Sequence, residues 1–121
     1  MLDGFSHVMV FATDVGRAAK WYGEVLGFRP YFVHPGGYAS LGHRELGIRL
    51  DVHHAEPGSA EVGHGTVVYF KTRDIEAAIA SLRQKGVRTG EPRREGESPR
   101  FAEFWDSEGN RLGLEEAQFG R

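Results

Sequence analysis

Residues 5–12, near the start of the chain, are mostly apolar and predict a short β-strand. Successive side chains of a strand point to opposite faces of the sheet. Val8 and Val10 would share one face of this strand. The other face would carry His7, Met9 and Phe11.

The spacing of apolar residues becomes helical after Asp14, whose carboxylate is well placed to cap a helix over residues 15–26. Gly27 ends this helix, and the next strand begins at Phe28. One apolar stripe along the helix would pack on a sheet. The stripe consists of Ala18, Trp21, Tyr22, Val25 and Leu26.

The strand–helix–strand pattern occurs a second time in the second half of the chain. A strand over residues 67–73 ends at Asp74, a helix follows over residues 75–85, and Gly86 ends it. The two capping aspartates, Asp14 and Asp74, lie 60 positions apart (74 minus 14), about half of the 121 residues. A repeat of this length predicts two similar modules.

Further short strands follow each helix. In the first half they are predicted over residues 30–33, 38–41 and 46–53, and the last of these has a polar face with Arg49 and Asp51. In the second half, strands are predicted in the two segments 101–105 and 111–115, joined by a tight turn. The polar segment that precedes them, residues 89–99, contains Pro and Gly and predicts a flexible loop or a short edge strand.

The order β-α-β-β-β therefore occurs twice, which predicts an α+β fold. Two four-stranded curved sheets, each with a helix on its outer side, would enclose a concave cavity. We expect a single domain over residues 1–121. Its first module would span about residues 5–54, a linker residues 55–63, and the second module about residues 64–117.

Composition excludes several classes of partner. A formal net charge of −2 gives no reason to expect binding to nucleic acid or to an anionic membrane, and no run of eighteen apolar residues predicts a membrane span. The chain contains no cysteine, so it has no disulfide and no thiolate chemistry of its own. The first residues lack the pattern of a secretory signal, and we expect the protein to be cytoplasmic.

The repeat resembles the vicinal oxygen chelate superfamily over about residues 5–116. The resemblance rests on Asp14, Trp21-Tyr22, Leu26-Gly27-Phe28 and the turn at residues 106–110. That superfamily includes glyoxalase I, bleomycin-type resistance proteins, fosfomycin-modifying thiol transferases and extradiol dioxygenases. The resemblance is specific for the fold and leaves the activity open, because the shared motifs are mostly structural.

The resemblance also implies where a divalent metal would bind. The family's enzymes use a histidine on the first strand of each module and a glutamate four residues after the glycine of the last turn. His7 matches the first histidine, and His64 matches the second only if the strand after it carries an insertion. The glutamate position is occupied by Gly113, which has no side chain to bind a metal.

Two carboxylates could replace that glutamate in a metal site. Glu115 shares the facing of Gly113 by strand alternation, so a divalent metal, if present, would use His7, His64 and Glu115. Glu103 lies on the strand before, and Arg49 is a candidate partner for its charge. Both glutamates can equally be solvated residues at the sheet surface.

Aromatic residues on the predicted strands predict an apolar cavity for a flat molecule; they are Phe11, Tyr31 or Phe32, Tyr38, Tyr69, Phe101 and Trp105. Gly113, in place of the metal-binding glutamate, favours a binding protein over an enzyme. The resemblance then points to the bleomycin-type resistance proteins, which sequester an antibiotic without altering it. The protein would need no cofactor and, as the resemblance implies, would be a homodimer. A metal-dependent isomerase, thiol transferase or dioxygenase is the alternative. The predicted ligand-binding residues are His7, Met9, Phe11, Tyr38, Arg49, Asp51, Tyr69, Phe101, Glu103 and Trp105.

Overall fold

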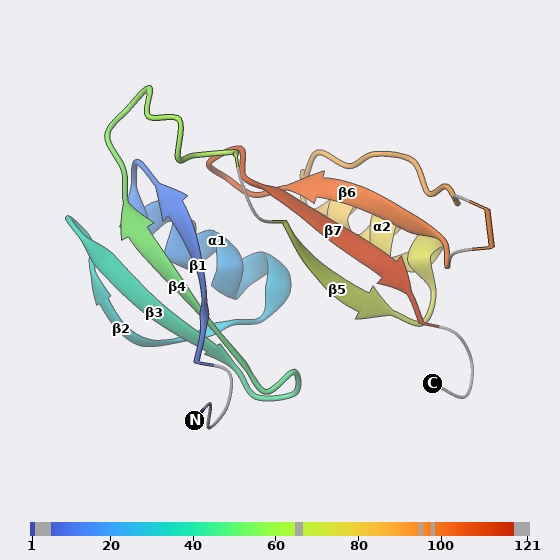
Figure 1. Cartoon of the computed structure of the whole chain (residues 1–121), viewed down its shortest axis with the longest axis horizontal. Helices are drawn as coiled ribbons and strands as arrows, with labels where there is room; N and C mark the ends of the chain where they lie inside the picture. Colours follow the sequence, from blue (N-terminus) through green and yellow to red (C-terminus); the bar gives the residue numbers. More distant parts are fainter. Residues whose placement is uncertain (2–5, 65–66, 95, 98, 118–121) are drawn as a thin grey trace. The chain divides into compact units, whose positions relative to one another are not determined.

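The computed structural model describes residues 1, 6–64, 67–94, 96–97 and 99–117 of the chain. These residues form two compact units, which meet in the sequence between Gly63 and His64. Each unit consists of one small sheet and one helix (Figure 1). Within the described residues, no helix is long and apolar enough to cross a membrane.

The first unit has the element order that its sequence predicts. Its elements are β1 (Val8–Ala12), α1 (Val15–Leu26), β2 (Arg29–His34), β3 (Tyr38–His43) and β4 (Ile48–His54). The strands form a four-stranded sheet in the order β1-β4-β3-β2. The pair β1 and β4 is parallel, and the other two pairs are antiparallel.

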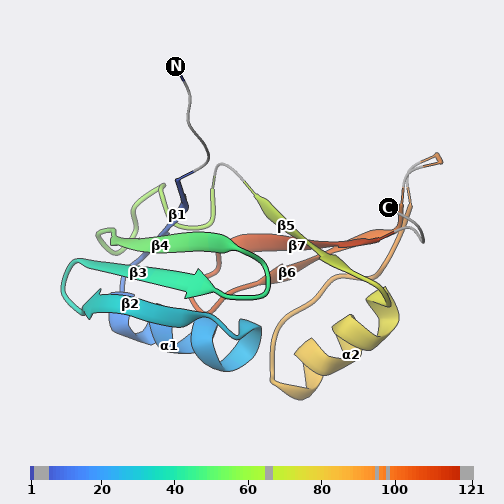
Figure 2. The same ribbon diagram turned by 90° about the horizontal axis from the view of Figure 1, so that it is seen from below.

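Helix α1 begins and ends where the sequence predicts. The carboxylate of Asp14 accepts a hydrogen bond from the Arg17 N–H at 3.0 Å, and Gly27 ends the helix with a left-handed φ of 82°. The helix covers one face of its sheet (Figure 2). Its buried residues are Val15, Ala18, Ala19 and Tyr22, which leaves the more exposed Trp21 at the edge of the predicted stripe.

The second unit repeats the plan with one difference. Its elements are β5 (Val68–Thr72), α2 (Ile75–Gln84), β6 (Phe101–Trp105) and β7 (Arg111–Glu116), and the strand order is β5-β7-β6. Over the described residues this sheet has three strands, where the sequence predicts four. In place of the fourth there are two isolated bridges, from Thr89 to Phe104 and from Arg93 to Phe101. Pro92, which has no N–H to donate, interrupts regular pairing between these bridges.

Each sheet has one face covered by its helix and an opposite face, which we call the open face. The strand registers show which residues share the open face. In the first unit, Met9 of β1, Asp51 of β4 and Ser40 of β3 are register partners on the open face. In the second unit, Tyr69 of β5, Gly113 of β7 and Glu103 of β6 are register partners there. The predicted ligand-binding residues therefore lie on or beside the open faces of the two sheets.

Candidate functional site

A buried carboxylate lies at the centre of the open face of the first unit. Asp51 is fully buried, and its side chain accepts hydrogen bonds from three others. Ser40 Oγ donates to Oδ1 at 2.8 Å, and the Tyr38 hydroxyl donates to Oδ2. Arg49 donates twice, from Nε to Oδ1 at 2.9 Å and from Nη2 to Oδ2 at 2.7 Å. Each carboxylate oxygen thus accepts two hydrogen bonds.

These contacts fix the charge of Asp51. Burial by itself would raise its pKa, but the hydrogen bonds from Arg49, Tyr38 and Ser40 outweigh burial and lower the pKa to about 2. Burial and the hydrogen bond to Asp51 both raise the pKa of Tyr38, which therefore stays a neutral hydrogen-bond donor. The same ion pair raises the pKa of Arg49. The open face consequently holds a permanent ion pair with fixed geometry.

His7 lies beside this network. Its Nε2 is 3.7 Å from Asp51 Oδ2, and its Nδ1 is hydrogen-bonded to Ser6 Oγ at 2.8 Å. Met9 and Phe11 continue along β1, and the ring of Phe11 lies 5.7 Å from that of His53. The structure thus brings together five predicted residues of the first unit around one network: His7, Met9, Tyr38, Arg49 and Asp51.

A tyrosine that the predicted set omits lies flat on the same face. The pairing of β2 with β3 shifts register between Pro30 and Phe32, so Tyr31 is an extra residue at a β-bulge. Its ring covers Gly42, because a Cβ on that glycine would lie only 2.5 Å from the Tyr31 hydroxyl oxygen. Any side chain at position 42 would displace the ring. The sequence left Tyr31 and Phe32 as alternatives for the aromatic surface, and it carries no local signal of the bulge that puts Tyr31 over Gly42.

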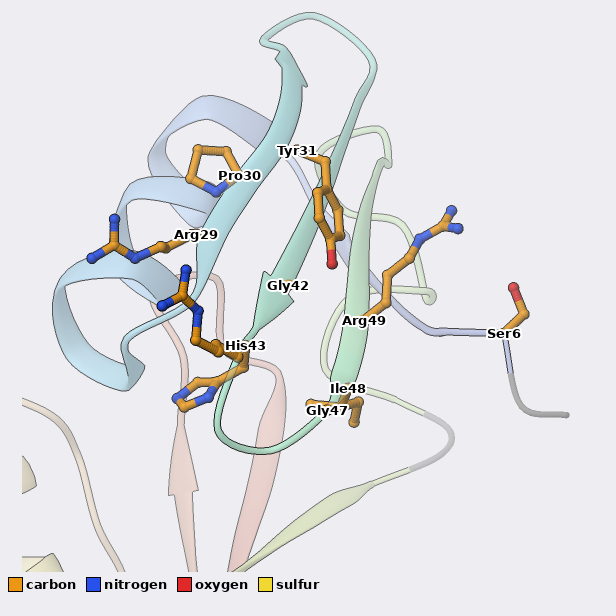
Figure 3. Close-up of a pocket in the computed structure, with 10 residues that line it drawn as sticks. Ser6, Arg29, Pro30, Tyr31, Gly42, His43, Gly47, Ile48 and Arg49 are labelled. Carbon is orange, nitrogen blue, oxygen red and sulfur yellow. The ribbon is translucent and has the colours of Figure 1, made fainter.

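A cavity of about 490 Å³ opens beside Tyr31 and belongs entirely to the first unit. Figure 3 shows the hydroxyl of Tyr31 over Gly42, with Arg49 on the neighbouring strand and its guanidinium directed away from the ring, while Arg29 and His43 extend from the other side of the hairpin. His43 donates from Nε2 to the Leu26 carbonyl at 3.0 Å, which ties the end of β3 to the end of α1. The cavity is therefore lined by an aromatic ring and by cationic groups.

Glu103 dominates the open face of the second unit. Arg93 binds its carboxylate at both oxygens, with distances of 2.8 Å from Nη1 and 2.6 Å from Nη2. This bidentate pair lowers the pKa of Glu103. The predicted partner, Arg49, is instead bound to Asp51 in the first unit. The alternation of side chains along the strand predicts that Glu103 lies on this face. The position of Arg93 could not be predicted, because the loop that carries it has no periodic pattern of apolar residues.

Two predicted aromatic residues of this unit are partly covered by arginines. The guanidinium of Arg88 lies 4.0 Å from the centre of the Trp105 ring, and that of Arg93 lies 4.6 Å from the centre of the Phe101 ring. Such cation–π contacts occupy one face of each ring. Tyr69, by contrast, is about half exposed.

The position of the expected metal-binding glutamate is covered by that tyrosine. A Cβ on Gly113 would lie under 3.0 Å from three atoms of the Tyr69 ring, a separation that real side chains do not show. Glycine at position 113 thus lets an aromatic ring lie where a carboxylate would otherwise project. The residues present do not fit the metal site that the resemblance implies.

The other side chains that the sequence offered as metal ligands do not form a metal site either. His64 is exposed and precedes β5, and Glu115 is exposed near the end of β7. Both carboxylate oxygens of Glu103 already accept hydrogen bonds from Arg93. Over the described parts of the chain, no three histidine, aspartate or glutamate side chains lie close enough to hold a metal ion.

Comparison with solved structures gives close matches over nearly the whole chain. TnmS3, an antibiotic binding protein from Streptomyces sp. CB03234, is 25% identical with a TM-score of 0.76, covering 97% of this chain and 100% of that chain. A glyoxalase family protein from Enterococcus faecalis is 23% identical with a TM-score of 0.77, covering 93% and 97% of the two chains.

A third match shares the fold at lower identity. The fosfomycin resistance protein FosX from Listeria monocytogenes, in complex with Mn(II) and dihydroxypropylphosphonic acid, is 12% identical with a TM-score of 0.78, covering 98% of this chain and 94% of that chain. Comparison with curated protein sequences gave no significant match. Residues 4–114 match the family model of the Glyoxalase/Bleomycin resistance protein/Dioxygenase superfamily. The chain therefore belongs to this superfamily, as its repeat, its helix caps and its last turn predicted.

Proposed function

We propose that this protein binds a small planar aromatic molecule, of the kind found among antibiotics, and that it does so without a metal ion. The observation that carries the proposal is the Tyr69 ring on Gly113. At the position where the family's enzymes have a carboxylate, this chain offers an aromatic surface. An exposed ring held flat on a sheet is suited to stacking with another flat ring.

The comparison with TnmS3 supports the same function, because that protein is described as antibiotic binding and covers almost the whole chain. In the proposed mode of action the ligand is captured and released unchanged. On the open face of the first unit, Met9 and Phe11 would supply apolar contacts, and Tyr38 and Arg49, which the buried Asp51 holds in place, would supply polar ones. On the open face of the second unit, a ligand would contact Tyr69, together with the surfaces of Glu103, Phe101 and Trp105 that their arginine partners leave open.

The proposal includes two further elements. The protein would act in the cytoplasm, which suits a chain without cysteine. It would act as a homodimer, for which the exposed apolar side chains Phe32, Val33 and Leu46 provide contact surface.

Removing the Tyr69 ring tests the proposal directly. In Tyr69→Ala, the affinity for a planar ligand should fall about tenfold, because one stacked aromatic pair with its buried area contributes about 1.5 kcal/mol. Gly113→Ala should lower the affinity similarly by tilting the ring. The measurement is calorimetric titration of each variant with a neutral planar probe, 2-naphthamide, and with a panel of aromatic antibiotics.

Gly36→Ala is the matched control, because a Cβ at that glycine meets nothing within 4 Å. It should bind like the wild type. Elemental analysis and titration with Mn, Ni and Zn complete the experiment. A stoichiometric metal whose binding disappears in His7→Ala would contradict the proposal and favour a metal-dependent enzyme.

A further inference from the structure

The cavity beside Tyr31 differs from the rest of the open faces in the charges that line it. Its ten lining residues include Arg29, Arg44 and Arg49 and contain no aspartate or glutamate. On the open face of the second unit, by contrast, Arg93 is matched by the carboxylate of Glu103. The cavity therefore carries an excess of positive charge.

Part of that charge is not neutralised by any carboxylate in the described part of the chain. Arg49 uses Nε and Nη2 to bind Asp51, and this leaves Nη1 directed away from the carboxylate. Among the residues that the structure describes, no carboxylate lies within ion-pair distance of Arg29 or Arg44. These guanidinium groups are available to an anion.

The Tyr31 hydroxyl lies over the position that neighbours Arg49 in the sheet. The hydroxyl is over Gly42, and Gly42 is the direct register partner of Arg49 in the antiparallel pair β3–β4. Figure 3 shows the hydroxyl end of the ring directed toward the strand that carries Arg49, while the guanidinium of Arg49 extends away from the ring. One hydroxyl donor and one guanidinium thus line the same cavity, and Asp51 fixes the orientation of the guanidinium.

The ring of Tyr31 supplies the other half of a binding site. One of its faces rests on the backbone of Gly42, while the side chain as a whole is 70% exposed. A flat ligand can stack on the opposite face, with its charged group toward the hydroxyl and Arg49. Arginine and hydroxyl donors are the groups that bind carboxylates and phenolates in proteins.

We propose that this cavity binds the carboxylate or phenolate of a planar aromatic acid whose ring lies on Tyr31. The inference rests on the proposed function and narrows its ligand class from flat aromatic molecules to aromatic anions. It also assigns specificity to Tyr31 and Arg49, because the charged group would select among ligands with similar rings.

The experiment compares two probes of the same shape, 2-naphthoate and 2-naphthamide, by calorimetric titration. The wild type should bind 2-naphthoate about tenfold more tightly, as expected for charge-assisted hydrogen bonds. Tyr31→Phe keeps the ring and removes the hydroxyl, so it should remove most of this preference while leaving the affinity for 2-naphthamide unchanged. The double variant Arg29→Gln/Arg44→Gln should reduce the preference and its sensitivity to salt.

Two controls accompany these variants. Tyr69→Phe makes the same chemical change in the tyrosine that covers Gly113, and it should leave the preference intact. Arg17→Gln removes an exposed arginine from α1, outside the cavity, and should also leave the preference intact.

Equal affinity of the wild type for both probes would overturn this inference and leave the proposed function standing. If Tyr31→Phe and Arg29→Gln/Arg44→Gln both still bind 2-naphthoate more tightly than 2-naphthamide by the wild-type factor, the inference is likewise overturned and the proposed function stands. Failure of both probes to bind would overturn the inference together with the proposed function.

Discussion

At the scale of single residues, Asp51 has the strongest influence on the open face. Four side chains from three segments of the chain surround one buried carboxylate: Ser40, Tyr38, Arg49 and His7. A buried charge is stable only when its partners are in place, so these side chains and Asp51 depend on one another. The network also fixes the orientation of Arg49, which lines the cavity.

Asp51→Asn should destabilise the protein at neutral pH by roughly 2 kcal/mol, estimated from the lowering of the Asp51 pKa from 3.8 to about 2. The amide also puts an N–H group opposite the donors of Arg49 and Tyr38. A carboxylate with a lowered pKa stabilises the fold above pH 4 and loses this effect as the pH falls toward 2. The difference from the wild type should therefore shrink over that range in urea unfolding experiments.

Glu56→Gln is the control for this comparison, because Glu56 is exposed in the linker. Its free energy of unfolding should match the wild type at every pH. A cost of Asp51→Asn that is the same at pH 7 and near pH 2 would show that the network acts through packing and not through charge.

At the scale of elements, both helices begin with the same kind of cap, an aspartate side chain that accepts a backbone hydrogen bond. Asp14 accepts a hydrogen bond from the Arg17 N–H, and Asp74 accepts one from the Ala77 N–H, each at 3.0 Å. Helix α2 has a further tie, because the Ile75 N–H donates to Glu116 at the end of β7 at 3.0 Å. Caps of this kind are local, and their residue types are readable in the sequence.

Replacing either cap, in Asp14→Ala or Asp74→Ala, should lower the free energy of unfolding by about 1 kcal/mol. The matched controls are Asp14→Asn and Asp74→Asn, since the asparagine side chain accepts the same hydrogen bond without the charge. Both sets are compared with the wild type in thermal or urea unfolding. If the asparagine substitutions cost as much stability as the alanine substitutions, charge and not capping would be responsible.

Local signals explain how much of the structure could be predicted. The caps at Asp14 and Asp74, the glycine after α1 and the alternation in β4 determine the element order and the family. The bulge at Tyr31 and the partner of Glu103 could not be predicted, because each depends on how one segment pairs with another and not on a local pattern. For residues 89–99 the sequence left a loop and a short edge strand open, and the described residues form only two isolated bridges there. Strand alternation predicted which side chains share the open faces, but not how they pair with one another.

At the scale of the whole molecule, each unit presents an exposed tyrosine on its open face. Tyr31 is 70% exposed and Tyr69 is 47% exposed, and each lies on a glycine of its own sheet. Large exposed rings are unfavourable in water unless they contact a ligand or another chain. Both halves of the repeat thus provide surface for binding or for assembly.

The proposed homodimer should have a mass of 27 kDa, twice the 13.5 kDa of the chain. Sedimentation velocity and light scattering at micromolar concentrations measure this directly. A mass of one chain throughout that range would contradict the dimer, and it would leave the binding proposals for the individual units to be judged by their own experiments.

The ring of Tyr69 on Gly113 also restricts how this protein can evolve. A glycine codon can become a glutamate codon by one base change, so the family's carboxylate is within easy mutational reach. The new side chain would have to displace the Tyr69 ring, which is half exposed and can turn away from the sheet. The same substitution would therefore add a carboxylate and remove the flat aromatic surface. At this position, stacking on Tyr69 and a metal-binding side chain exclude each other.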